Sequence, residues 1–209
     1  MLIIGLTGSI GMGKSAAAAV FRAENVPVCD ADVEVHKLYA SSGAAVAPIE
    51  AAFPGTTSPA GVDRQKLASM LLADPSGFQR LEALVHPLVR AAEQAFLRAA
   101  KAENSWAAVL EIPLLFEGGG DNAVDATVVV SAPPAMQRAR VLARPGMTLE
   151  KFEQIIARQW PDTKKRAAAT FVVDTGGTMA SSAEQIRVVL RELRAGNVAT
   201  RAYDTYWRT

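Results

Sequence analysis

Residues 8–15, which read GSIGMGKS, constrain the fold of this chain more than any other stretch. They satisfy the pattern G-x-x-x-x-G-K-[ST], with an apolar run before them and a run of helix-forming residues after them. Glycines let backbone N–H groups turn toward an anion without a clashing Cβ atom, and the following helix directs its positive N-terminus at the same anion. The alternative, a glycine-rich turn followed by an incidental Lys-Ser, would not explain why the pattern, its spacing and its flanking segments all agree. The stretch therefore predicts a strand, a phosphate-binding loop and a helix.

Within this loop, two side chains have distinct predicted roles. The Lys14 ammonium group can reach β- and γ-phosphate oxygens, and the Ser15 hydroxyl can ligate Mg²⁺. The single cysteine and the two histidines have no neighbours at ligand spacing, so we expect Mg²⁺ to arrive with ATP. The residues expected to contact ATP here are Gly8, Ser9, Ile10, Gly11, Met12, Gly13, Lys14, Ser15 and Ala16.

Five short apolar runs predict the strands of one sheet. None of them alternates cleanly between apolar and polar residues, which is typical of parallel strands covered on both faces. The runs lie at 2–6, 26–29, 107–112, 126–131 and 170–173, and helical stretches are predicted at 14–25, 74–104, 150–160 and 181–196. This alternation predicts an α/β fold of three layers around a parallel five-stranded sheet with right-handed crossovers.

The long interval between the second and third strands predicts a helical insertion that covers one side of the sheet. It contains a turn-rich segment at 53–63 and a helix that we expect to break or bend near Pro87. The helix at 181–196 is expected to be capped by its opening serines and to end at Gly196.

Composition excludes some classes of protein. The 209 residues include 22 Lys and Arg against 21 Asp and Glu, for a net charge of +1, which does not favour nucleic acid or a membrane surface as a partner. No apolar stretch is long enough to span a membrane, and the apolar start lacks a basic leader. Cys29 lies at the end of an apolar run and is expected to be a packed structural thiol. We therefore expect a cytoplasmic protein.

A phosphate-binding loop alone does not separate switch GTPases, motor ATPases and small kinases. The guanine-specific N-K-x-D is absent, and the D-x-x-G at 174–177 follows the last predicted strand, where a strand-end turn is the better interpretation. Only the segment 108–117, with Glu111 and Glu117, approaches the apolar run and acidic residue of a motor ATPase.

A kinase also needs a base for its acceptor, and Asp30 and Asp32 are the candidates. They follow the second predicted strand, where α/β sheets place their sites, and in an extended segment both side chains would leave on the same face. One carboxylate could accept the acceptor's hydroxyl proton while the other helps to hold Mg²⁺ through water. The alternative is that Asp30 caps a helix beginning near Val33.

A mobile cationic lid is predicted on either side of the turn at 145–146. Arg140 and Arg144 are four residues apart and would share a helix face, with Arg138 and Arg158 nearby. Such arginines could neutralise charge on a phosphoryl group in transfer, although a solvated basic face is an equal alternative.

Taken in order, these motifs resemble the dephospho-coenzyme A kinase family of P-loop kinases over essentially the whole chain. Besides the loop, the resemblance rests on Asp-Ala-Asp at 30–32, His-Pro-Leu at 86–88, Pro-Leu-Leu-Phe-Glu at 113–117, and an R-x-x-x-R at 140–144 with the downstream Gln159.

The resemblance implies transfer of the γ-phosphoryl group of ATP to the ribose 3′-hydroxyl of dephospho-CoA. It implies that Asp32 is the base and binds the acceptor, that Lys14 and Arg140 act in catalysis, and that Arg144 contacts ATP. It further implies that the acceptor pocket is lined or braced by Arg64, His86, Leu114 and Glu117.

The resemblance also implies a division of the chain. Residues 1–34, 106–137 and 166–209 would form the nucleotide-binding core, residues 35–105 the acceptor side, and residues 138–165 the lid. A monomer or weak homo-oligomer is expected. Two alternatives stay open, namely a kinase of a nucleoside, nucleotide or polyol, and a nucleotide-gated binding module.

Overall fold

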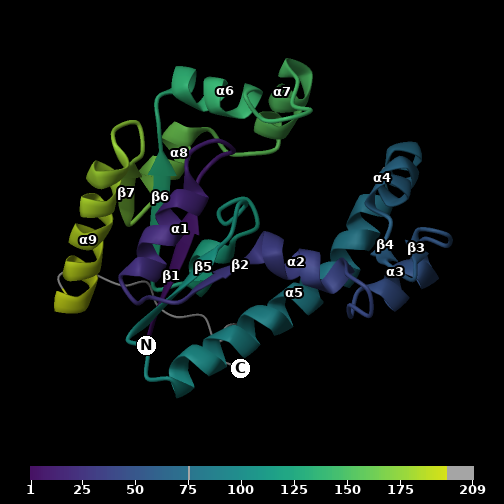
Figure 1. Ribbon diagram of the computed structural model, residues 1–209, viewed down its shortest axis with the longest axis horizontal. Helices are drawn as coiled ribbons and strands as arrows, with labels where there is room; N and C mark the ends of the chain where they lie inside the picture. Colours follow the sequence, from purple (N-terminus) through teal and green to yellow (C-terminus); the bar gives the residue numbers. More distant parts are fainter. Residues whose placement is uncertain (75, 197–209) are drawn as a thin grey trace. The chain divides into compact units, whose positions relative to one another are not determined.

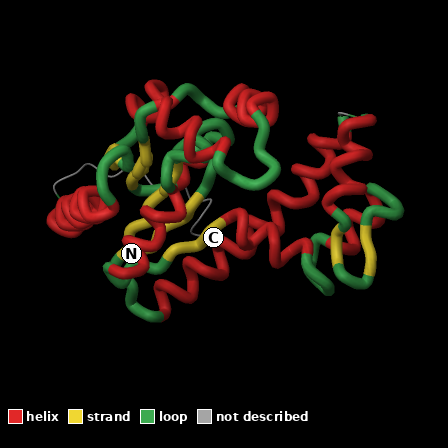
Figure 2. Tube along the Cα trace, turned by 45° about the horizontal axis from the view of Figure 1, so that its top comes forward, coloured by secondary structure: helices red, strands yellow, loops and turns green. Residues whose placement is uncertain are grey.

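The computed structural model describes residues 1–74 and 76–196, so the predictions that fall on residues 197–209 lie outside the described chain. The chain divides into two compact units. The first contains Met1–Cys29 and the chain from Ala99 onward, and the second contains Asp30–Arg98. The described helices and strands are labelled in Figure 1 and coloured by type in Figure 2.

The first unit is built on a five-stranded sheet of order β2-β5-β1-β6-β7. The strands are β1 (Leu2–Thr7), β2 (Val28–Asp30), β5 (Ala107–Glu111), β6 (Ala126–Ser131) and β7 (Phe171–Asp174). β1 pairs in parallel with both β5 and β6, and β6 pairs in parallel with β7. The five predicted strands are confirmed, with the second beginning two residues later than expected.

Two helices, α1 (Lys14–Ala23) and α9 (Met179–Ala195), cover one face of this sheet. The two helices contact each other and lie next to the strands in Figure 1, where α1 is purple and α9 is yellow. Phe21 of α1 and Ile186 of α9 are fully buried in one cluster with Ile4, Val109 and Val128 of the strands. Burial of this apolar surface is the main stabilising contribution to the unit.

The opposite face of the sheet is covered by the connection that follows β5. A Cβ atom added to Gly5 of β1 would lie 2.8 Å from Leu115 and 3.2 Å from Val124, so this connection packs directly on the strand. The central strands β1, β5 and β6 are thus buried on both faces, which explains why their sequences lack alternation.

Three shorter helices complete the first unit: α6 (Pro134–Leu142), α7 (Leu149–Ala157) and α8 (Asp162–Ala168). A 3₁₀ turn, η1, spans Gly120–Ala123. Figure 1 shows α6 following the end of β6, with α7 next to it. The helix-turn-helix predicted on either side of 145–146 is confirmed, and Gly146 adopts a left-handed conformation in that turn.

The second unit contains α2 (Ala31–Tyr39), α3 (Val46–Ala52), α4 (Arg64–Ala73) and most of α5 (Gly77–Ala102), with a small hairpin of β3 (Thr57–Ser58) and β4 (Gly61–Val62). Its own apolar cluster includes Ile49, Phe53 and Leu67. The predicted turn-rich segment forms this hairpin. Figure 2 shows the hairpin in yellow beside the helices of this unit.

Two local predictions about helices need correction. Of the break or bend expected near Pro87, the break does not occur: α5 continues through Pro87, because a proline removes one hydrogen bond of the helix while the rest of a long amphipathic helix stays packed. The cap of α9 is Thr178, whose hydroxyl accepts from the Ser181 N–H, and the serines lie inside the helix. Gly196 ends α9 as expected. Within the described residues, no helix has the length and apolarity to cross a membrane.

Candidate active site

The loop between β1 and α1 has the backbone of an anion-binding cradle. Gly11 and Gly13 have φ values of 78° and 87°, which L side chains rarely adopt. A Cβ atom on Gly11 would also lie 2.5 Å from Cγ2 of Val141, so glycine is required by the close approach of α6. Gly13 caps α1 without a side-chain hydrogen bond, which leaves the N–H groups of the first turn to face a ligand.

The side chains of the loop divide between the core and the ligand side. Lys14 donates from Nζ to the Gly8 carbonyl at 2.9 Å, across the mouth of the loop. Ser15 is exposed in the first turn of α1, and its hydroxyl is the kind of hard oxygen that Mg²⁺ takes as a ligand. Met12 is buried and its sulfur accepts from the Ala132 N–H at 3.1 Å, so Met12 offers only its backbone to a nucleotide.

Arg140 reaches the loop through one intermediate residue. Its Nη2 donates to the Thr175 carbonyl at 2.8 Å, and the Thr175 hydroxyl donates to the Met12 carbonyl at 2.8 Å. Thr175 is buried and follows the end of β7. The segment 174–177, interpreted from sequence as a plain strand-end turn, therefore lies against the phosphate-binding loop. Its position after the last strand of a parallel sheet was the available signal, since ligands bind at the carboxyl ends of such strands.

Two glutamines form hydrogen bonds with the backbone of Ile10. Gln137 of α6 donates from Nε2 to the Ile10 carbonyl at 2.8 Å, and Gln159 accepts the Ile10 N–H at 3.1 Å. Gln159 was singled out by its motif, whereas Gln137 was not, because a glutamine inside a basic helix gives no sequence signal. Both backbone polar atoms of one loop residue are thus satisfied, by Gln137 next to the predicted lid and by Gln159 within it.

The remaining lid arginines are exposed. Arg144 lies beyond the end of α6, in the turn toward Gly146, so the prediction that it shares a helix face with Arg140 is wrong. The helix ends at Leu142 because a turn containing Pro145 and Gly146 follows closely. Arg138 and Arg158 are also exposed, and Arg140 is half-buried.

Asp30 and Asp32 do not lie in one extended segment, which corrects the sequence-based interpretation. β2 ends at Asp30 and α2 begins at Ala31. The Asp30 carboxylate caps α2 by accepting from the N–H groups of Asp32 and Val33, at 2.9 and 3.2 Å. Asp32 is exposed in the first helical turn.

Within the second unit, Arg64 and His86 are both exposed. The Arg64 guanidinium lies 5.2 Å from the centre of the Tyr39 ring. Burial raises the pKa of the Tyr39 hydroxyl, and the positive charge of Arg64 opposes part of that shift. The predicted site residues of this unit therefore include one cation fixed over an aromatic ring.

Leu114 and Glu117 follow β5 in the first unit, in different environments. Leu114 is exposed, with 45% of its surface accessible. Glu117 forms an ion pair with Lys165 of α8, with 2.9 Å between Oε1 and Nζ, and the same oxygen accepts from the Trp160 N–H at 2.6 Å. Lys165 was not predicted to have a role.

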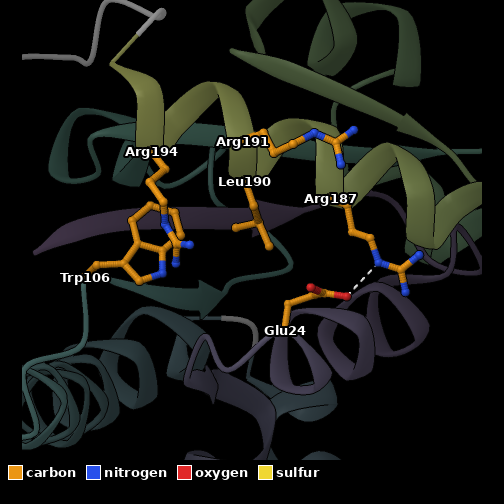
Figure 3. Close-up of a pocket in the computed structure, with 6 residues that line it drawn as sticks. All are labelled: Glu24, Trp106, Arg187, Leu190, Arg191 and Arg194. Carbon is orange, nitrogen blue, oxygen red and sulfur yellow. Dashed lines mark hydrogen bonds and ion pairs between the residues drawn. The ribbon is translucent and has the colours of Figure 1, made fainter.

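A separate pocket of about 170 Å³ lies between α1, α9 and the start of β5 (Figure 3). Its cations already have partners: Arg187 donates to Glu24 at 2.7 Å, Arg191 donates to Glu184 at 3.1 Å, and Arg194 lies over the Trp106 ring. We assign it no ligand.

A parallel sheet with a glycine-rich loop between its first strand and helix, a lysine over the loop and an arginine held beside it define a P-loop phosphotransferase. The sequence matches the model of the dephospho-CoA kinase family over residues 2–181. The chain belongs to the dephospho-CoA kinase family.

Individual relatives agree with this assignment. A dephospho-CoA kinase of Agrobacterium fabrum is 53% identical over 195 residues, which cover 93% of this chain and 100% of that protein. A crystal structure from Thermus thermophilus has a TM-score of 0.78 at 34% identity, covering 92% of this chain and 97% of that one. The dephospho-CoA kinase of Campylobacter jejuni has the same fold, with a TM-score of 0.69 at 23% identity over 94% of this chain and 98% of that one.

Proposed function

We propose that this protein transfers the γ-phosphoryl group of ATP to the ribose 3′-hydroxyl of dephospho-CoA, which yields CoA and ADP. The observation that carries the proposal is the phosphate-binding loop, with Lys14 and the Arg140–Thr175 contact beside it, in a chain of this family. The loop backbone, including Ala16 at its helical end, would bind the β- and γ-phosphates.

The chemistry needs a proton acceptor and a stabiliser of charge. Asp32 would accept the proton of the acceptor hydroxyl as its oxygen attacks the γ-phosphorus and the bond to the ADP oxygen breaks. Lys14 and Arg140 would stabilise the negative charge on the phosphoryl group, and Arg144 would contact ATP from the lid turn. Mg²⁺, held by the Ser15 hydroxyl and the phosphates, would neutralise charge on the β- and γ-oxygens.

Residues of each unit, taken by itself, are proposed to contact or support the acceptor. Arg64, fixed over Tyr39, would meet the phosphates of dephospho-CoA, and exposed His86 would contact the same substrate. Leu114 would offer an apolar surface, while Glu117 would brace this region through Lys165.

The test is phosphoryl transfer from ATP with Mg²⁺ to dephospho-CoA, run beside adenosine, AMP and gluconate. Turnover with dephospho-CoA is expected, with transfer to the others slower by at least about 10²-fold, since sites built on hydrogen bonds can discriminate by about 10⁴–10⁵-fold. Transfer only to another acceptor would retain the kinase and overturn the acceptor. ATP binding without transfer to any of them would favour a nucleotide-gated binding module.

A further inference from the structure

Lys165 is a buried cation that the proposed chemistry does not use. It lies in α8 with none of its side chain exposed, and its Nζ is 2.9 Å from Oε1 of Glu117 and 3.4 Å from the Pro113 carbonyl. Lysine is almost never fully buried unless it is paired, because removing its charge from water is costly. The attraction between the two buried charges can be offset by the cost of removing both from water, so the ion pair is weak evidence for added stability of the fold. Its role is better sought in the residues that it positions.

The pair acts on the segment that joins α7 to α8. The Glu117 oxygen that meets Lys165 also accepts from the Trp160 N–H at 2.6 Å. The adjacent Phe116 ring stacks on the Trp160 ring, with 5.7 Å between centroids and 9° between planes. Residues 116 and 117 together fix both the backbone and the side chain of Trp160.

Gln159, the residue immediately before Trp160, is the one that meets the phosphate-binding loop. Its Oε1 accepts the Ile10 N–H at 3.1 Å. A glutamine side chain reaches such a contact reliably only if its own backbone is held in place, and Glu117 supplies that hold one residue away. A continuous series of contacts thus runs from Lys165 through Glu117 and Trp160 to Gln159 and Ile10.

We propose that Glu117 and Lys165 are positioning residues for nucleotide binding, which hold Gln159 against Ile10 and so preorganise the phosphate-binding loop. Lys165 fixes the rotamer of Glu117, and Oε1 of Glu117 holds the backbone of Trp160 in place. The position of that backbone in turn orients the neighbouring Gln159. This role differs from contact with the acceptor, which the family motif suggests for Glu117. It rests on the proposed function only in taking ATP as the nucleotide.

Two double variants separate the hydrogen bond from the charge pair. Glu117→Gln with Lys165→Met removes both charges but leaves a side-chain oxygen for the Trp160 N–H. Glu117→Leu with Lys165→Met removes both charges and that acceptor as well. Both variants avoid leaving one buried charge without its partner, which is the change most prone to unfold the chain.

The expected result is that the variant with Gln at 117 binds ATP nearly as tightly as the unmodified protein. The variant with Leu should bind ATP about tenfold more weakly, within the range seen for residues that couple through a network. Its Ile10 amide should also exchange hydrogen faster. Calorimetry with ATP and hydrogen exchange measure binding and the loop directly, so both remain informative if the acceptor proves to be another compound.

A cycle with Gln159→Leu tests the route. If Glu117 acts through Gln159, adding Glu117→Leu together with Lys165→Met should weaken ATP binding little further once Gln159 is Leu. Additive losses would overturn the proposal, as would a raised KM for dephospho-CoA with unchanged ATP affinity. The variant with Leu at 117 could instead melt at a lower temperature but keep its ATP affinity and its Ile10 exchange rate. That result would show that the Glu117–Lys165 pair has a purely structural role and would overturn the proposal.

Discussion

Arg140 donates from Nη2 to the carbonyl oxygen of Thr175 at 2.8 Å, and Thr175 in turn donates its hydroxyl to Met12 of the phosphate-binding loop. The contact joins α6 to the end of β7, which are adjacent in the unit but far apart in sequence. It orients a guanidinium beside the loop before any ligand arrives, which is the preorganisation that stabilises charge in a transition state at little further cost.

Replacing Arg140 by alanine should therefore lower kcat by about 10²–10³-fold, as the loss of one preorganised charge donor does in other enzymes. Steady-state assay with ATP and dephospho-CoA measures the change. Arg138→Ala is the matched control, because Arg138 lies on the same helix and is exposed. Equal losses in the two variants would assign the effect to general charge on α6 and not to Arg140.

Asp32→Asn should lower kcat by about 10²–10⁴-fold, the contribution typical of a general base, while the Kd for ATP stays nearly constant. Asp30→Asn is its control. Asparagine caps helices as well as aspartate does, so this variant keeps the contacts to Asp32 and Val33 and should remain active. A loss of activity confined to Asp30→Asn would move the base to that residue.

Gly11→Ala should destabilise the first unit by about 1–3 kcal/mol. The alanine would have to adopt a positive φ, and its methyl group would clash with the Val141 side chain. Gly146→Ala provides the comparison: its φ of 72° is similarly positive, but a Cβ there meets nothing within 4 Å. Chemical denaturation of both variants separates the clash from the backbone strain. If the two lose equal stability, α6 yields to the methyl group and the close approach is unimportant.

Burial raises the pKa of the Glu93 carboxyl to about 7, with Arg90 opposing the shift and Glu34 adding to it. The folded chain thus binds this proton more tightly than the unfolded chain. The stabilising contribution is complete below the ordinary value of 4.5 and is lost as the pH rises through about 7.

Between those pH values the free energy of unfolding should fall by up to about 3 kcal/mol relative to that of Glu93→Gln, which cannot ionise. Urea unfolding from pH 4.5 to 8 measures the difference. Glu82→Gln, an exposed site on the same helix, should show no such trend. Parallel pH profiles for the unmodified protein and Glu93→Gln would contradict the raised pKa.

Local features account for what the sequence predicts correctly. The phosphate-binding loop, its flanking strand and helix, and the two helices on either side of residues 145–146 each depend on neighbouring residues, namely glycines with unusual φ, a lysine and serine at fixed spacing, and a Pro-Gly turn. The three central strands are recognisable because burial on both faces leaves a continuous apolar run. The helix cap formed by Asp30 also depends only on neighbouring residues. Because α2 begins at Ala31, Asp30 caps this helix, and Asp30 and Asp32 do not form a pair in an extended segment.

Only the tertiary structure decided how distant polar side chains pair. Lys164 and Lys165 are indistinguishable in the sequence, yet Lys164 lies exposed over the Trp160 ring while Lys165 is fully buried against Glu117. Gln137 and Gln159 meet Ile10 across separations of 127 and 149 residues. Such contacts depend on which faces of α6 and α8 turn inward when the sheet is packed, and no pattern of neighbouring residues encodes that choice.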